Sequence, residues 1–319
     1  MERREFIKLT ARACAGVIAS GGMGFWLASR SKRPTVRTET GTRLDYTIPS
    51  SPDLPELASV KGDSPSELTE MVINALGGIN RFISRGDIVV IKPNIGWDRI
   101  PQQAANTNPE VVKKTVELCY NAGAKKVIVT DASCNDPRRC FARSGIANAA
   151  EEAGAEVELP EKRKLKNVNM DGVILKNWPI YSQYLEADKV INIPILKHHN
   201  LTRLTIGMKN WYGMIGGIRS QLHQDIHNSI ADLAQFMKPT LVILDAFRVL
   251  LTNGPQGGSP RDVKNLNIIA AGTDQVAIDA YGAHLFGINP NEIPFITIAH
   301  QRGLGKMDIN EINIKNMIT

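Results

Sequence analysis

Short runs of aliphatic and β-branched residues alternate along this chain with stretches of helical periodicity. Apolar runs of strand length, typical of strands buried on both faces of a parallel sheet, occur at 87–92, 126–130 and 189–193. Apolar residues at helical spacing lie between or before them, at about 66–76, 108–121 and 144–153. Strands and helices that take turns predict an α/β fold, with a mainly parallel sheet flanked by helices.

The same alternation continues through the rest of the chain and sets the expected domain organisation. Further strands are predicted at 156–159, 173–175, 240–244 and 267–271, and a helix at 221–237. We therefore expect one α/β body over 64–319, either continuous or with an inserted second lobe around 194–238. Residues 34–63 are rich in proline and lack periodicity, which predicts a linker.

The first 33 residues resemble a twin-arginine export signal. Arg3 and Arg4 precede Phe6, an apolar stretch rich in alanine and glycine runs over 13–28, and basic residues follow it. We expect an exported protein at the periplasmic or cell-envelope face, with the twin-arginine translocase as its partner during export. A short membrane helix is the alternative, and an uncleaved leader would tether the protein to the membrane through residues 9–28.

The positive charge of the chain belongs to this leader. Seven Lys or Arg and two Glu lie in residues 1–33, so that 31 of the 38 basic and 30 of the 32 acidic residues remain in the body. Aromatic residues make up only 6% of the chain. A nearly neutral body with few aromatic rings lacks the features by which most nucleic-acid-binding proteins hold their ligand, so nucleic acid is not an expected partner.

Polar residues follow several of the predicted strands directly. Ligands of open α/β sheets bind at the carboxyl ends of the strands, so these residues are the first candidates for a site. Taken singly each could be an ordinary turn or helix-cap residue. Together they predict a polar pocket that fits a small anionic ligand or a metal ion, and the residues concerned are Lys92, Asn94, Asp131, Ser133, Lys197, His199 and Asp245.

A glycine-rich segment at 206–217 supplies two further candidates. Its glycines allow a ligand to approach the backbone closely, and Lys209 and Asn210 can neutralise and hydrogen-bond a carboxylate or phosphate. The alternative is a flexible loop with a solvent-facing lysine. No Walker-type phosphate loop, Gly-x-Ser-x-Gly or dinucleotide-binding glycine motif occurs in the sequence.

His223 and His227 are four residues apart in the predicted helix at 221–237. That spacing places two imidazoles one turn apart, where they can bind a metal ion with His199 or Asp225 as a third ligand. Surface or hydrogen-bonded histidines are the alternative. Because imidazole titrates near neutral pH, His199, His223 and His227 are also candidate acid–base groups, together with Lys197.

The cysteines do not form a metal or cluster motif. Cys119 falls in a predicted helix and is expected in the core, whereas Cys134 and Cys140 flank a loop and could form a disulfide in an oxidising compartment. An iron–sulfur cluster normally needs four thiolates, so a cluster built into this chain is not expected.

Several of these segments together resemble the family catalogued as domain of unknown function 362. The resemblance spans roughly residues 86–305 and is carried by residues 86–94, 107–109, 122–131, 187–199, 207–213, 245, 253–255 and 271–279. Some members of that family carry an added ferredoxin-like segment with clustered cysteines, which implies an association with iron–sulfur redox systems. This chain has no such segment, so an electron-transfer role would require a redox partner.

A fainter similarity is to nickel-pincer lactate racemases, through the Lys197-x-His199 pattern and the loop rich in glycine and lysine. The resemblances imply an exported enzyme that binds a metal or metallo-cofactor and a small anionic substrate, for redox chemistry or acid–base isomerisation. The alternative is a non-enzymatic binding or assembly module for an iron–sulfur redox partner. The sequence leaves enzyme and binding module both open.

Overall fold

The computed structural model describes residues 35–37 and 42–319. The predicted leader, residues 1–33, lies outside this part of the chain. Residues Val36–Thr319 form one compact unit, so residues 194–238 are not a separate lobe. Within the described ranges, no helix combines the length and the hydrophobicity that a membrane span needs.

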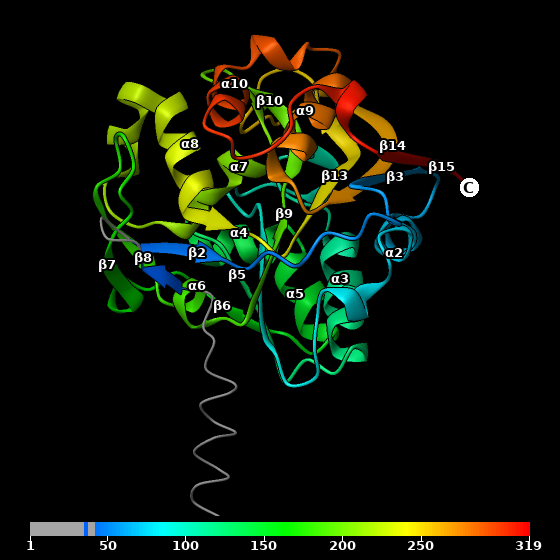
Figure 1. Ribbon diagram of the computed structural model, residues 1–319, viewed down its shortest axis with the longest axis horizontal. Helices are drawn as coiled ribbons and strands as arrows, with labels where there is room; N and C mark the ends of the chain where they lie inside the picture. The colour runs from blue at the N-terminus through cyan, green and yellow to red at the C-terminus, as the bar shows by residue number, and fades with distance from the viewer. Residues whose placement is uncertain (1–34, 38–41) are drawn as a thin grey trace, which may run out of the picture. The chain divides into compact units, whose positions relative to one another are not determined.

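A ten-stranded, mostly parallel sheet forms the centre of the fold (Figure 1). Five neighbouring strands, β13-β9-β4-β5-β6, are mutually parallel, and β14 is antiparallel to β13 and to β3. Along the sheet the strands are β15 (Ile314–Ile318), β3 (Leu57–Lys61), β14 (Val263–Gly272), β13 (Leu241–Leu250), β9 (Lys189–Ile193), β4 (Ile88–Pro93), β5 (Lys126–Thr130) and β6 (Glu156–Glu158). Beside β13 lies β10 (Ile195–His199), which pairs with β11 (Arg203–Thr205).

Helices cover both faces of this sheet, as the alternation in the sequence predicts (Figure 1). One face packs on α2 (Pro65–Ala75), α3 (Pro109–Asn121), α4 (Pro137–Arg143) and α5 (Ile146–Glu152). The other faces α7 (Gly207–Asn210), α8 (Ile226–Phe236), α9 (Gln275–Phe286) and α10 (Pro294–Gln301). Successive residues of a strand point to opposite faces of the sheet. Val89 and Ile91 therefore pack on the face covered by α2 to α5, and Val90 points to the opposite face.

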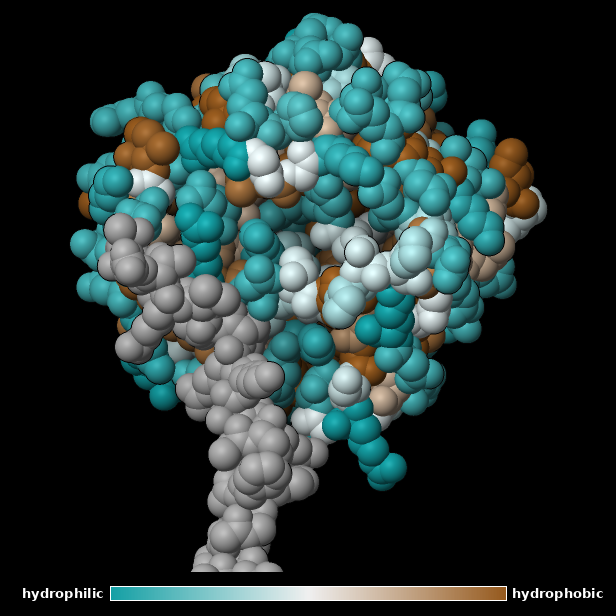
Figure 2. All heavy atoms as spheres, viewed as in Figure 1, coloured by the Kyte–Doolittle hydropathy of each residue, from teal (hydrophilic) through white to brown (hydrophobic). Residues whose placement is uncertain are grey.

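Smaller elements complete the unit. A three-stranded sheet runs in the order β1 (Thr35–Arg37), β2 (Thr42–Asp45), β12 (Met237–Lys238), and a hairpin is formed by β7 (Leu165–Asn169) and β8 (Asn177–Tyr181) next to α6 (Gln183–Glu186). Short 3-10 helices are η1 (Ile79–Arg81), η2 (Pro101–Gln103), η3 (Lys162–Lys164), η4 (Trp211–Met214), η5 (Arg219–Asp225), η6 (Pro260–Asp262), η7 (Pro290–Glu292) and η8 (Ile309–Glu311). Most residues on the face shown in Figure 2 are hydrophilic, with hydrophobic residues in scattered patches.

The predicted linker at 34–63 is wrong at β2 and β3, because Leu44 and Tyr46 are buried as well as the residues of β3. Strand β3 lies inside the sheet between β14 and β15, and Leu57, Ala58 and Val60 are fully buried. This strand is hard to recognise from the sequence for two reasons. Prolines are dense around it, and no helical pattern directly precedes its short apolar run. The α/β body therefore begins before residue 64.

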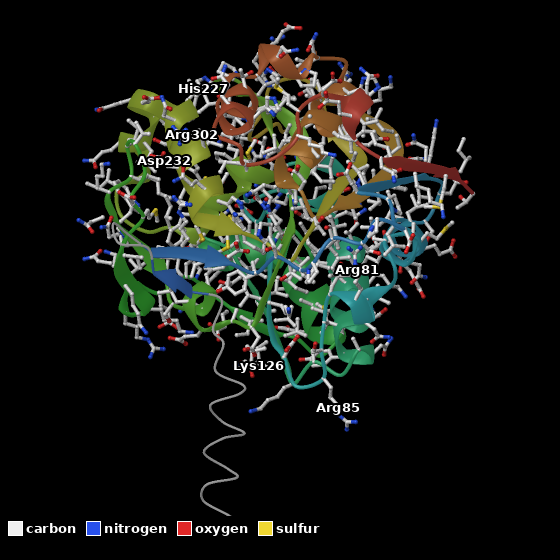
Figure 3. All side chains as sticks on the ribbon, viewed as in Figure 1. Arg81, Arg85, Lys126, His227, Asp232 and Arg302 are labelled. Atoms are coloured by element: carbon white, nitrogen blue, oxygen red, sulfur yellow. The ribbon has the colours of Figure 1, made fainter. Side chains whose placement is uncertain are left out.

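The predicted strand at 173–175 is also wrong. These residues form the connection of the β7–β8 hairpin, and their backbone amides donate to Asp232 of α8 instead of to a neighbouring strand. The N–H groups of Val173, Ile174 and Leu175 lie 3.0, 2.6 and 2.9 Å from its carboxylate oxygens. Arg302 Nη1, after α10, pairs with the same carboxylate at 2.7 Å (Figure 3).

We expect Asp232→Ala to lower the free energy of unfolding by about 3 kcal/mol, because it leaves three amides without their acceptor and leaves the half-buried guanidinium of Arg302 with Asn228 alone. The matched control is Glu292→Ala, which removes the exposed ion pair with Arg203 and should cost less than about 1 kcal/mol. Urea unfolding of both variants measures the difference. Equal losses would mean that Asp232 does not anchor the hairpin.

Candidate functional site

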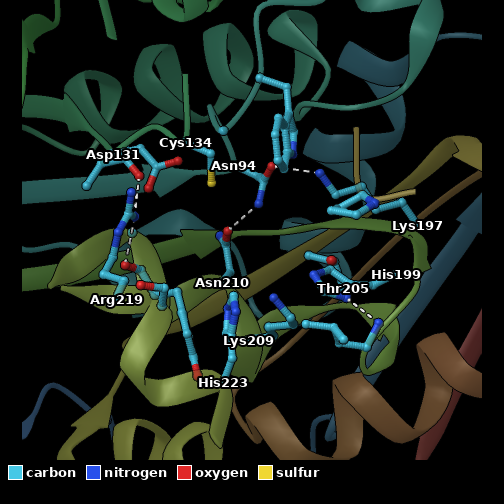
Figure 4. A pocket seen from close by; sticks show the side chains of 18 of the residues that line it. Asn94, Asp131, Cys134, Lys197, His199, Thr205, Lys209, Asn210, Arg219 and His223 are labelled. Carbon is cyan, nitrogen blue, oxygen red and sulfur yellow. Dashed lines mark hydrogen bonds between the residues drawn. The ribbon is translucent and has the colours of Figure 1, made fainter. Parts of the chain in front are cut away.

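A cavity of about 660 Å³ opens at the carboxyl ends of β4 and β5 (Figure 4). Its walls come from the ends of these strands, from β10, and from the segment that runs from α7 to η5. Parallel neighbours bring their carboxyl ends to one edge of a sheet, which is why residues far apart in the sequence meet here. Eight of the predicted site residues line it: Lys92, Asn94, Asp131, Lys197, His199, Lys209, Asn210 and His223.

A buried ion pair joins the ends of β4 and β5. Lys92 Nζ lies 2.8 Å from Asp131 Oδ1, and both side chains are almost fully buried. The other carboxylate oxygen accepts the backbone N–H of Ile95 at 2.6 Å. Burial lowers the pKa of Lys92, and the neighbouring Asp131 opposes that shift. The pair fixes one charge of each sign in the wall of the cavity.

Asparagine side chains connect the segments that form the walls of the cavity. Asn94 donates to Asn210 Oδ1 at 3.0 Å and accepts from Lys197 Nζ at 3.1 Å (Figure 4). Asn210 donates in turn to Asn192 Oδ1 at 2.8 Å. A carboxylate of α9 holds the first residues of α7 in place, because Asp279 accepts the N–H groups of Gly207 and Met208 at 2.7 and 3.0 Å. The amide side chains are thereby held in fixed orientations.

Two more lysines reach the cavity with lowered pKa values. Burial lowers the pKa of Lys197 to about 7, although its ammonium donates to the carbonyl of Ala105 at 2.5 Å as well as to Asn94. Burial also lowers the pKa of Lys209 to about 8. Lys209 Nζ lies 5.1 Å from the centre of the Tyr212 ring. Both amines therefore change charge close to neutral pH.

Arg219 is a cation of the site that the sequence does not single out. Its guanidinium donates to the carbonyl oxygens of Ala132 at 2.7 Å and Ser133 at 2.6 Å, which joins η5 to the loop after β5. Within residues 35–37 and 42–319, no carboxylate forms an ion pair with Lys197, Lys209 or Arg219. Arg219 follows no strand, so the rule that finds the other residues does not reach it.

The ring of His199 is held as a hydrogen-bond donor. Its Nδ1 accepts the backbone N–H groups of Leu201 at 3.1 Å and Thr202 at 3.4 Å. Burial, with Lys209 and Lys197 nearby, lowers its pKa to about 2, so the ring is neutral at physiological pH. With Nδ1 as the acceptor, the proton of the neutral ring is on Nε2. His199 can therefore donate to a ligand, but it offers neither a lone pair to a metal ion nor a general base.

The predicted pairing of His223 with His227 is wrong. His223 lines the cavity and its ring stacks on Tyr212 with centroids 6.2 Å apart, whereas His227 is not a lining residue and stacks on Phe295 of α10 (Figure 3). The cause is a change of helix type, because η5 ends at Asp225 and α8 begins at Ile226. Four residues across this junction do not return to the same face.

These positions also affect the predicted metal site, because they separate its proposed ligands. No group of three His, Cys, Asp or Glu side chains able to hold a metal ion occurs in the part of the chain that the structure describes. His199 has no free lone pair, and His227 lies against α10. The predicted ligand set of His199, His223 and His227 is therefore not formed. Three cations without carboxylate partners further disfavour a bare metal ion at this place.

Two other predicted residues serve the fold. Asp245 is buried within β13, where its carboxylate accepts the N–H groups of Asn108 at 2.8 Å and Phe247 at 3.1 Å, and burial raises its pKa to about 6. The predicted strand ends at residue 244, but β13 continues to Leu250, so Asp245 does not reach the edge. Ser133 donates to the carbonyl of Ile95 at 2.5 Å and is not a lining residue.

The three cysteines in the described part of the chain carry free thiols. Cys119 is buried in α3, as expected, and Cys140 is buried in α4, while Cys134 is exposed and lines the cavity. The disulfide that the sequence allows between Cys134 and Cys140 is not formed in this structure.

Gly213 leaves the space that the ion pair of Lys92 and Asp131 needs. A Cβ at this position would overlap Asp131 Oδ1 and would lie 2.8 Å from Lys92 Nζ. We expect Gly213→Ala to lower the free energy of unfolding by about 1–3 kcal/mol, as overpacking does in buried sites.

The control for this prediction is Gly96→Ala in the same cavity. Its Cβ would meet Asn94 Oδ1 at 3.6 Å, an ordinary contact, so the variant should unfold within about 0.5 kcal/mol of the unchanged protein. Thermal and urea unfolding compare the two. A Gly213→Ala protein as stable as Gly96→Ala would show that the ion pair tolerates a side chain there.

Comparison with known proteins gives relatives of limited similarity. A thylakoid-associated protein of Synechocystis sp. is 28% identical over 242 residues, 73% of this chain and 73% of that protein. The lactate racemase apoprotein from Thermoanaerobacterium thermosaccharolyticum aligns with a TM-score of 0.43 and 11% identity over 77% of this chain, and a protein from Thermotoga maritima with 0.40 and 11% over 76%. The chain spans 60% of the length of each of these two structures. The model of the family described as "Domain of unknown function (DUF362)" matches residues 89–284, more than half of the chain, and the protein therefore belongs to that family.

Proposed function

We propose that the protein binds a small organic anion in this cavity, as an acid–base enzyme in which Lys197 carries the exchangeable proton. One observation supports the proposal above the others. Four cationic side chains line the cavity, namely Lys92, Lys197, Lys209 and Arg219, and Asp131 is the one carboxylate among the lining residues. A carboxylate or phosphate group would restore the balance of charge in this buried space.

The neutral groups of the cavity suit the same ligand. Nε2–H of His199 is a donor whether the ring is neutral or protonated, and Asn94 and Asn210 present fixed amides. These groups would orient an anion, while the lysines would hold its charge. A metal ion takes no part in this proposal, because the described side chains do not supply its ligands.

Lys197 is the candidate for proton transfer because of its surroundings. Its ammonium is almost fully buried, and its hydrogen bonds go to a carbonyl and an amide oxygen, neither of which carries a charge. A pKa of about 7 leaves charged and neutral amine at comparable populations at neutral pH. That is the condition under which a side chain can both give and take a proton.

Removing one cation tests the binding site. We expect Lys209→Met to weaken the binding of acetate and of inorganic phosphate by at least about tenfold, because a charge-assisted hydrogen bond is lost. Lys113→Met is the matched control, since Lys113 is half-exposed on α3 and pairs with Glu152 outside the cavity. It should bind both anions within about twofold of the unchanged protein. Calorimetric titration measures the affinity of each variant for the two anions, and equal affinities in the two variants would contradict the proposal.

The lowered pKa values predict how binding depends on pH. An anion favours the charged amines, so it raises the pKa values of Lys197 and Lys209 from about 7 and about 8, and binding takes up protons above pH 7. Acetate, whose own charge is constant from about pH 6 to pH 9, should bind best near pH 6. Its affinity should fall by only about twofold between pH 6 and pH 7, and by several-fold per pH unit above about pH 7, where both lysines lose their protons.

Calorimetry in two buffers of different ionisation enthalpy measures the proton uptake directly. Lys197→Met should lose the part of the uptake that begins near pH 7, while Lys113→Met should keep it. An affinity for acetate that is independent of pH across this range would show that neither lysine takes part in binding.

A further inference from the structure

The cavity reverses the usual distribution of charged and apolar side chains. Its lysines are buried, since Lys92 is 0%, Lys197 1% and Lys209 9% exposed, and Arg219 is partly buried. Leu201 and Ile218 line the same cavity and are 52% and 63% exposed. Soluble proteins normally place lysine outside and leucine inside. The floor of this cavity is therefore cationic, and its mouth, defined here by Leu201 and Ile218, is aliphatic.

The two residues of the mouth are connected to residues of the floor. Leu201 is held by the hydrogen bond from its backbone N–H to His199 Nδ1. Ile218 directly precedes Arg219, whose guanidinium is fixed by carbonyl oxygens of the loop after β5. The backbone of each mouth residue is thereby linked to a polar side chain that lines the cavity. Trp97 and Pro255 add further apolar lining.

Exposure of such side chains is uncommon elsewhere on the molecule. Six large hydrophobic side chains of the described residues are exposed, and two of the six are those of the mouth. Exposed aliphatic groups beside a cavity are typical of a binding surface. The volume agrees, because cavities of about 300–1,000 Å³ hold ligands of drug size, and acetate or phosphate would leave most of the 660 Å³ unfilled.

We propose that the ligand of this cavity is an amphiphilic anion. Its charged head lies among Lys197, Lys209 and Arg219, and its aliphatic chain leaves the cavity along Leu201 and Ile218. This inference rests on the proposed binding of an anion and adds the chemical class of that anion. The chain of the ligand covers the mouth, which explains why these aliphatic side chains are exposed in the unliganded protein.

A series of straight-chain carboxylates tests the inference. The affinities of acetate, butanoate, hexanoate, octanoate and decanoate are measured by calorimetry, each below its micelle concentration. Burial of a methylene group predicts a gain of about two- to fourfold in affinity per added carbon, up to the length at which the chain passes the mouth. Octan-1-ol, which has the chain without the charge, should bind far more weakly than octanoate.

Two double variants separate the mouth from non-specific binding of fatty chains. Leu201→Ser with Ile218→Ser should flatten the dependence of affinity on chain length, measured in each variant as the ratio of its octanoate affinity to its acetate affinity. Val173→Ser with Ile174→Ser is the matched control, because these residues are 62% and 40% exposed and are not lining residues of the cavity. The control should keep the full dependence, and the melting temperature shows that both variants are folded.

Each outcome bears on one of the two proposals. If acetate does not bind, the proposed anion site is wrong. If acetate binds and its longer homologues bind no better, the anion site stands and the amphiphilic ligand is refuted, which would leave a protein partner as the cover of the mouth. A dependence on chain length that survives in the variant of Leu201 and Ile218, or octan-1-ol binding as tightly as octanoate, would also overturn the inference.

Discussion

The buried ion pair of Lys92 and Asp131 determines how the site is built. It joins the ends of two parallel strands, and the same carboxylate holds the backbone of Ile95, where the chain leaves β4. The neighbouring Ala132 donates its N–H to the carbonyl of Gly213 at 2.9 Å, which brings the segment after α7 against the pair. Breaking such a pair leaves a charge in a medium of low dielectric constant, so the surrounding elements are tied to this geometry.

The remaining charges of the cavity follow from this arrangement. With Asp131 occupied by Lys92, Lys197 and Arg219 have neutral oxygen atoms as partners, and Lys209 lies against the ring of Tyr212. Buried cations without counter-ions are costly, and the protein partly avoids the cost by lowering the pKa values of Lys197 and Lys209. The cavity is therefore electrostatically incomplete, which is the physical basis for proposing an anionic ligand with a dependence on pH.

Much of the site can be predicted from the sequence because a simple geometric rule applies to it. Lys92 lies at the carboxyl end of β4, Asn94 and Asp131 directly follow parallel strands, and neighbouring parallel strands bring those ends together. The rule fails for Asp245 because β13 runs on beyond it, and it cannot find Arg219, which follows no strand. For His227 the spacing is right for a continuous α-helix, but the helix begins only at Ile226.

The sequence by itself determined the α/β class, the main strands and the family, because hydrophobic periodicity and local motifs are properties of neighbouring residues. It did not determine that β3 enters the sheet, nor that residues 173–175 bind Asp232 instead of a strand. Only the tertiary structure decided which histidine faces the cavity, which cations lack a counter-charge and where the aliphatic mouth lies. Those features depend on which segments far apart in the sequence come into contact, and the pattern of neighbouring residues does not specify those contacts.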